Sequence, residues 1–93
     1  MAGALELGIA VSKFFIDTSD QDSFIRDETG YEFEDEQAAK AAAIDALPDM
    51  ARDELPDGDA RSFTTIIRDE AGKPILQASL TLRVISMIPT QTR

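Results

Sequence analysis

Carboxylates are the residues of this sequence best suited to chemistry, because the 93-residue chain contains 18 Asp and Glu but no His and no Cys. The commonest general base and the thiolate nucleophile are therefore absent, and no serine has a histidine to activate it. Two kinds of chemistry are left: binding of a hard cation and hydrolysis by a pair of carboxylates. Because 18 acids offer many pairs, no dyad is singled out.

The acidic stretch at residues 17–22 carries three carboxylates, at Asp17, Asp20 and Asp22. A calcium loop needs oxygen ligands at alternate positions, a glycine at its sixth position and a glutamate at its twelfth. Loops that begin at Asp17 or Asp20 lack the glycine. We therefore expect a solvated loop, with weak cation binding as the alternative, and we predict no catalytic, cofactor-binding or metal-binding residue.

The net charge of −9 is unevenly distributed along the chain. Residues 17–36 hold nine carboxylates against Arg26 alone, whereas residues 60–93 hold five basic residues against two acids. Such an acidic surface repels polyanions, so we expect neither direct nucleic-acid binding nor membrane binding. A basic protein partner is compatible with this charge.

The N-terminus has no basic start and Glu6 interrupts its apolar run, so it does not resemble a secretory signal. No apolar segment reaches the roughly 18 residues that a membrane helix needs. We expect one cytoplasmic domain over residues 1–93. Alternation of apolar residues predicts strands over residues 5–11 and 13–17, so residues 1–12 form either an extension or the start of a long first strand.

The sequence "IRDETGYEF" at residues 25–33 returns as "IRDEAGKPI" at residues 67–75. In each copy the Asp can accept hydrogen bonds from the backbone of a tight turn, and Gly supplies a residue of positive φ. We predict two hairpins of one turn type, at Asp27 to Gly30 and at Asp69 to Gly72. The alternative is a duplicated functional loop, and the turn explains every shared letter except the arginine.

Between the two predicted hairpins, residues 36–55 have the pattern of a helix with Asp35 as its N-cap. Pro48 removes a backbone donor within this pattern, so we predict a kink or a break near residues 46–47. Helical spacing places one set of apolar residues toward a sheet: Ala43, Ile44, Leu47, Met50, Ala51 and Leu55.

The fold class that follows is α+β: an antiparallel sheet of four to five strands, in the order strand, hairpin, helix, hairpin, with one long, Pro-kinked helix on one face. Pairing Ile67 with Ile75 puts Ile66 and Leu76 on the helix side. The opposite face would then expose four large apolar residues that we predict as a homodimer interface: Phe63, Ile67, Ile75 and Ile85. The alternative is that residues 5–11 fold back over this patch.

Four segments taken together resemble a widespread family of small bacterial domains of unknown function. They are "KFFI", "IRDETGYEFED", the Ala-rich "EQAAKAAAIDAL" and the closing "FTTIIRDEAGKPIL". The similarity runs from residue 13 to about residue 80. The chain departs from the family pattern at Ile16-Asp17, where a His-Leu pair is usual, at Pro48, and in its extensions at both ends. The resemblance implies the fold and a bacterial source, and it supplies no activity.

Three functions follow from different classes. The first is a non-catalytic, self-associating protein-interaction module. The second is an acidic inhibitor or nucleic-acid mimic that binds a basic protein. The third is a carboxylate-dyad hydrolase, which would need a pocket containing a carboxylate of raised pKa.

Overall fold

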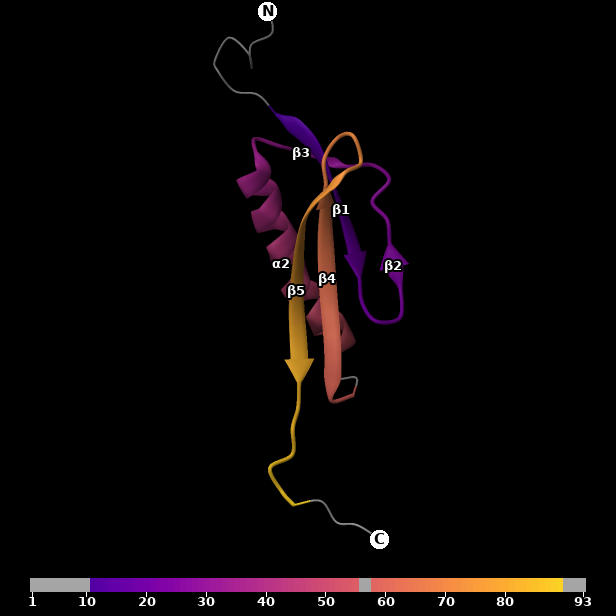
Figure 1. Ribbon diagram of the computed structural model, residues 1–93, viewed down its shortest axis with the longest axis vertical. Helices are drawn as coiled ribbons and strands as arrows, with labels where there is room; N and C mark the ends of the chain where they lie inside the picture. Colours follow the sequence, from indigo (N-terminus) through magenta and orange to yellow (C-terminus); the bar gives the residue numbers. More distant parts are fainter. Residues whose placement is uncertain (1–10, 56–57, 90–93) are drawn as a thin grey trace, which may run out of the picture.

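The computed structural model describes residues 11–55 and 58–89, in which one helix lies across one face of an antiparallel sheet (Figure 1). The predicted α+β class is confirmed. The first ten residues, for which a strand or an extension was predicted, lie outside the described residues. The elements are β1 (Ser12–Ser19), β2 (Phe24–Ile25), β3 (Tyr31–Phe33), α2 (Glu36–Glu54), β4 (Ala60–Arg68) and β5 (Pro74–Arg83).

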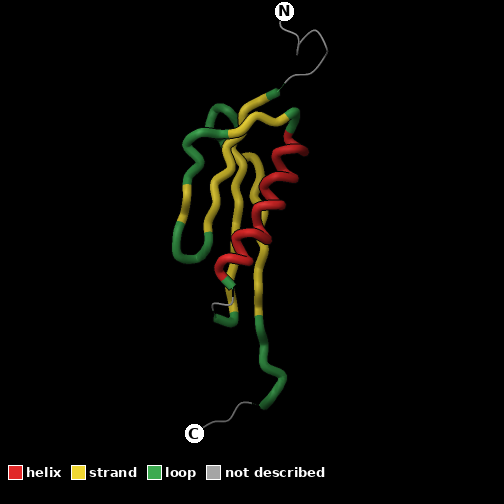
Figure 2. The backbone as a smooth tube through the Cα atoms, turned by 180° about the vertical axis from the view of Figure 1, so that it is seen from behind, coloured by secondary structure: helices red, strands yellow, loops and turns green. Residues whose placement is uncertain are grey.

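The sheet has the strand order β2-β1-β4-β5, and β3 pairs with the start of β1. Seen from behind, the helix crosses the longer strands, β2 lies on the far side of the sheet from the helix, and β3 leads into the start of the helix (Figure 2). One margin of the sheet is therefore built from strands of two and three residues, and the other is the ten-residue strand β5. Within the described part of the chain, no helix has the length and apolar character that crossing a membrane requires.

Helix α2 begins where predicted, because the Asp35 carboxylate accepts a hydrogen bond of 2.9 Å from the Ala38 N–H. The buried side chains recur every four residues and are mostly small, which lets the helix approach the sheet closely. They are Ala39, Ala43, Leu47 and Ala51. The prediction that Ile44 packs on the sheet is wrong, since its side chain is 45% exposed.

Pro48 lies inside this single 19-residue helix, so the predicted break does not occur. Pro48 cannot donate to the carbonyl of Ile44, and both residues are exposed on the surface of the helix. Water can therefore satisfy the carbonyl, which limits the cost of the missing donor. The predicted bend stays a prediction.

Both repeated turns have the backbone expected of them. Gly30 and Gly72 have φ values of +81° and +89°, which confirms the predicted left-handed positions. The Asp27 carboxylate accepts from the Gly30 N–H at 2.9 Å, and the Asp69 carbonyl accepts from the Gly72 N–H at 2.8 Å. The shared Asp and Gly thus serve the turn in both copies.

The strands around the first turn do not form the predicted hairpin. Instead of pairing with each other, β2 and β3 both pair with β1: Ile25 lies opposite Thr18, and Phe33 lies opposite Ser12. Strand β1 is long enough to offer a partner to each segment in turn. The loop at residues 26–30 spans the interval between them.

The second hairpin forms, but its register differs from the prediction by one residue. A bulge between Ile67 and Arg68 places Ile67 opposite Leu76 and Thr65 opposite Ala78. Since paired residues share a face, the odd-numbered residues of β4 lie on the helix side with the even-numbered residues of β5. Leu76 therefore lies on the helix side, as predicted. The prediction for β4 is wrong, because Ile67 rather than Ile66 lies on that side.

The predicted interface patch does not exist for the same reason. Phe63 and Ile67 are each 1% exposed and form the core beneath α2. Ile75, next to the bulge, is half-buried against that core, and Ile85 lies beyond the end of β5. The open face of the sheet instead carries hydroxyl pairs, Ser62 with Thr81 and Thr64 with Ser79, each at 3.1 Å.

Candidate functional site

A buried ion pair closes the β1 side of the sheet. Arg68 donates from Nε and Nη2 to the two oxygens of the Asp17 carboxylate, at 2.8 and 3.0 Å. Asp17 and Arg68 are only 3% and 5% exposed. The same Nη2 donates to the Asp27 carbonyl at 2.9 Å, and the guanidinium lies 4.7 Å from the centre of the Phe15 ring. A bidentate pair of this kind fixes position as well as charge.

Asp27 replaces a strand in the interval between β2 and β3. Its carboxylate accepts from the Ile16 N–H at 3.0 Å, while its own N–H donates to the Asp17 carboxylate at 2.9 Å. On either side of Ile16, Phe14 pairs with β3 and Thr18 pairs with β2. The outer edge of β1 is therefore paired with strands on either side of Ile16, and the N–H of Ile16 is satisfied by the Asp27 side chain.

The pKa values of the buried Asp17 and the half-buried Asp27 lie below their ordinary range. For Asp17 the hydrogen bonds from Arg68 lower the pKa and outweigh the opposing effect of burial. For Asp27 burial raises the pKa, but the hydrogen bonds from the N–H groups of Gly30, Ile16 and Thr29 together outweigh that effect and lower the pKa. Both groups are thus held as carboxylates, and neither is poised to carry a proton at neutral pH.

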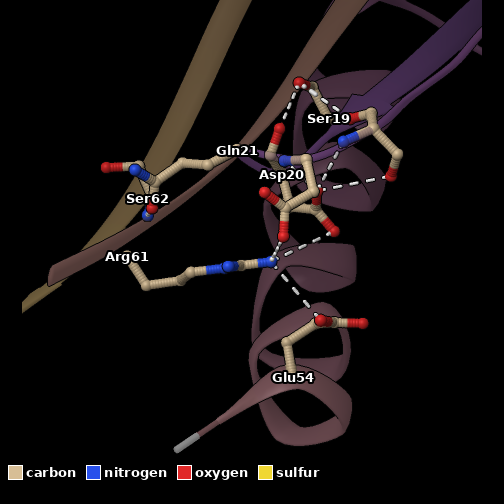
Figure 3. A network of polar contacts seen from close by, with 8 residues as sticks. Ser19, Asp20, Gln21, Glu54, Arg61 and Ser62 are labelled. Atoms are coloured by element: carbon tan, nitrogen blue, oxygen red, sulfur yellow. Dashed lines mark hydrogen bonds and ion pairs between the residues drawn. The ribbon is translucent and has the colours of Figure 1, made fainter. Parts of the chain in front are cut away.

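A second arginine, Arg61, forms ion pairs near the other end of β4. Arg61, which is 7% exposed, points its Nη2 at three carboxylates from the β1–β2 loop and the end of α2 (Figure 3). The distances are 3.7 Å to Asp20, 3.2 Å to Asp22 and 3.4 Å to Glu54. Asp20 also folds its own loop, accepting from the N–H groups of Asp22 and Ser23, which lowers the pKa of Asp20.

The structure separates the three carboxylates that were considered as cation ligands. Asp17 is bound by Arg68, whereas Asp20 and Asp22 face Arg61. Over residues 11–55 and 58–89, no group of three His, Cys, Asp or Glu is placed to hold a metal ion. These carboxylates are engaged in folding the loop. Sequence reasoning missed both arginines, and the signal that could have found Arg68 was the shared arginine that the turn left unexplained.

The β5 side of the sheet has a different character. In the described part of the chain β5 pairs with β4 alone, and Arg83, at its end, is its one charged residue. A groove with a volume of about 390 Å³ lies between β5 and the helix, lined by Ile44, Leu47, Pro48, Ala78, Ser79 and Leu80. Ile44 and Leu80 face this groove while 45% and 40% exposed. A long edge that is uncharged up to Arg83 thus runs beside an apolar groove.

A comparison with protein families finds one family whose model covers the residues that build these features. A model described as "Domain of unknown function (DUF6894)" matches residues 13–81. The chain belongs to the DUF6894 family. The matched region includes both arginine clusters and nearly all of β5, and it confirms the predicted membership of a family of small domains of unknown function. No curated protein and no solved structure matches the chain at a significant level.

Proposed function

We propose that this DUF6894 chain is a small, non-catalytic protein-interaction module that self-associates as a homodimer through the open edge of β5. The observation that carries the proposal is the ten-residue β5 edge beside the apolar groove. Sheet edges normally avoid pairing by being short, by carrying lysines or inward charges, or by being covered. Strand β5 has Pro74 at its first residue and Arg83 at its last, and none of these features between them.

The distribution of charge favours a second copy at this edge. Two molecules of net charge −9 repel one another wherever their acidic surfaces meet. Strand β5 contains no carboxylate, and the groove beside it is lined without one. The β5 edge is therefore a place where two copies can approach with little repulsion.

The ionised state of Asp17 and Asp27 supports a non-catalytic role. A hydrolytic dyad needs one carboxyl whose pKa is raised so that it can donate a proton. Asp17 and Asp27, which are joined by a hydrogen bond and both contact Arg68, have lowered pKa values. Their hydrogen bonds hold the loop at residues 26–30 on β1.

The test is the oligomeric state of two variants that add the same charge. Leu80→Lys places a cation beside the groove, whereas Thr29→Lys places one in the exposed turn on the other side of the sheet. We expect wild type and Thr29→Lys to be dimers by light scattering at micromolar concentration, and Leu80→Lys to be a monomer. A monomeric wild type, or a dimer untouched by Leu80→Lys, would refute the proposal.

A second candidate is binding of a basic protein partner. A cavity of about 220 Å³ between the β1–β2 loop and the end of α2 combines Asp53 and Glu54 with the apolar side chains of Ile25 and Met50. A lysine or arginine side chain has a matching apolar stem and charged end. Titration with a Lys- and Leu-containing peptide should show binding that weakens with salt and with Asp53→Asn, but not with Asp45→Asn. Salt-independent binding would exclude this candidate.

A further inference from the structure

The backbone groups that face the open edge can be identified from one hydrogen bond. Just after β5, the Val84 N–H donates to the Asp59 carbonyl at 2.7 Å, in register with the β4–β5 pairs. Backbone groups alternate between the two sides of a strand, so the even-numbered residues of β5 bond to β4. The N–H and C=O groups that point outward belong to Gln77, Ser79, Thr81 and Arg83.

An independent contact supports this alternation. The pairing makes the even-numbered residues of β4 point away from β5, and the Ser62 N–H indeed donates to Gln21, in the loop after β1, at 2.9 Å. The outward-facing residues of β5 carry their side chains on the open face of the sheet. Leu80, which lies between two of them, has its side chain on the helix face beside Ile44.

We propose that β5 pairs antiparallel with β5 of a second copy, around a two-fold axis at Leu80. This inference rests on the proposed self-association and specifies its register. Gln77 of one copy pairs with Arg83 of the other, and Ser79 pairs with Thr81. All four outward-facing residues of each copy are then hydrogen-bonded to the other copy.

Other registers satisfy fewer of these groups. A slip of one residue would place outward-facing groups opposite groups that already bond to β4. Moving the axis to Ser79 or to Thr81 leaves one outward-facing residue of each copy beyond the four-residue ladder. An axis at Arg83 would place two guanidinium groups opposite one another, which is destabilising, whereas the axis at Leu80 keeps them at opposite ends.

The side chains at this axis are complementary to themselves. Ser79 opposite Thr81 repeats the hydroxyl pairing that already crosses β4 and β5 at 3.1 Å. Leu80 lies opposite Leu80 at a non-hydrogen-bonded position, where the Cα atoms approach to about 4.5 Å. The two leucines thereby cover each other and the Ile44 side of each groove.

Disulfide trapping can read this register directly, because the chain has no cysteine of its own. Cysteines form a bridge when their Cα atoms lie about 4.4–6.8 Å apart. Leu80→Cys should give a covalent dimer under mild oxidation. Ser79→Cys alone and Thr81→Cys alone should stay largely uncrosslinked, whereas their equimolar mixture, which retains Leu80, should crosslink.

Each outcome decides something different. Crosslinking of Ser79→Cys alone would move the axis to Ser79, and crosslinking of Thr81→Cys alone would move it to Thr81; either result overturns the register while leaving self-association intact. A dimer with no crosslink at any of these positions would place the interface elsewhere. A wild-type monomer would remove both proposals, and protected β5 amides in that monomer would assign the edge to a segment of the same chain.

Discussion

The two margins of the sheet differ in how the outward-facing backbone groups of their strands are hydrogen-bonded. Along β1, two stretches of the outer edge pair with β2 and β3, and the Ile16 N–H between them donates to the Asp27 carboxylate. Arg68 holds Asp27 there by donating to its carbonyl. Along β5, four successive outward-facing residues have no partner in the described part of the chain. Polar groups stabilise the first margin, whereas the second has no partner strand among residues 11–55 and 58–89. Changes at the β1 margin should therefore alter folding, and changes at the β5 margin should alter association.

The largest effect is expected from Asp17→Ala, which leaves the Arg68 guanidinium buried without its carboxylate partner. Removing one member of a buried ion pair is strongly destabilising, and we expect the free energy of unfolding to fall by about 3 kcal/mol. Urea denaturation measures it. The control is Asp22→Ala, whose side chain is 74% exposed and whose loss should change stability by about 0.5 kcal/mol or less. Equal effects of the two variants would contradict the stabilising role of the buried Asp17–Arg68 ion pair.

Acid should weaken the same margin. In the folded chain the pKa values of Asp17 and Asp27 lie below the ordinary 3.8, so the unfolded chain takes up protons first as the pH falls. Their contribution to stability is complete above the unfolded pKa and is lost as the pH falls through the lowered folded values. Urea titrations from about pH 6 to pH 2 should show this loss, and the free energy of unfolding should fall less steeply with falling pH in Asp17→Asn than in wild type. An equal dependence on pH in the two proteins would contradict the contribution of the Asp17 carboxylate to stability.

The two repeated glycines should differ in what they tolerate. A Cβ at Gly30 would lie 2.9 Å from Lys13 Cγ and 3.0 Å from Phe15 Cε1, whereas at Gly72 the nearest atom, in Arg68, is 3.9 Å away. Both positions carry the penalty of positive φ, so Gly72→Ala should cost about 1 kcal/mol and Gly30→Ala about 2 kcal/mol. Thermal denaturation compares them. A larger loss at Gly72 would contradict the close packing of the first turn on β1.

The smallest effect on folding is expected at the open margin. Leu80→Lys changes a side chain that is already 40% exposed, so the free energy of unfolding of the isolated chain should change by about 0.5 kcal/mol or less. Denaturation of wild type and variant, both diluted until monomeric, makes the comparison. A large loss would mean that Leu80 supports the fold of a single chain, and the contrast between the two margins would fail.

Local patterns in the sequence were enough to predict the fold class, the Asp35 cap and the two glycine turns, because each depends on neighbouring residues. The register of β4 and β5 could not be read in the same way. A single bulge after Ile67 exchanges the two faces of a strand, and both faces of "SFTTII" carry apolar residues. The pairing of Arg68 with Asp17 joins residues 51 positions apart, and among 18 acids nothing marked the partner.

Amide hydrogen exchange along β5 tests the central claim most directly. The amides of Ala78 and Leu80 bond to β4 and should be protected at every concentration, which makes them internal controls. The amides of Gln77, Ser79, Thr81 and Arg83 should become protected as wild-type protein is concentrated, and should exchange rapidly in Leu80→Lys. Rapid exchange of these four amides in concentrated wild-type protein would contradict the account, because the β5 edge would then stay open to water.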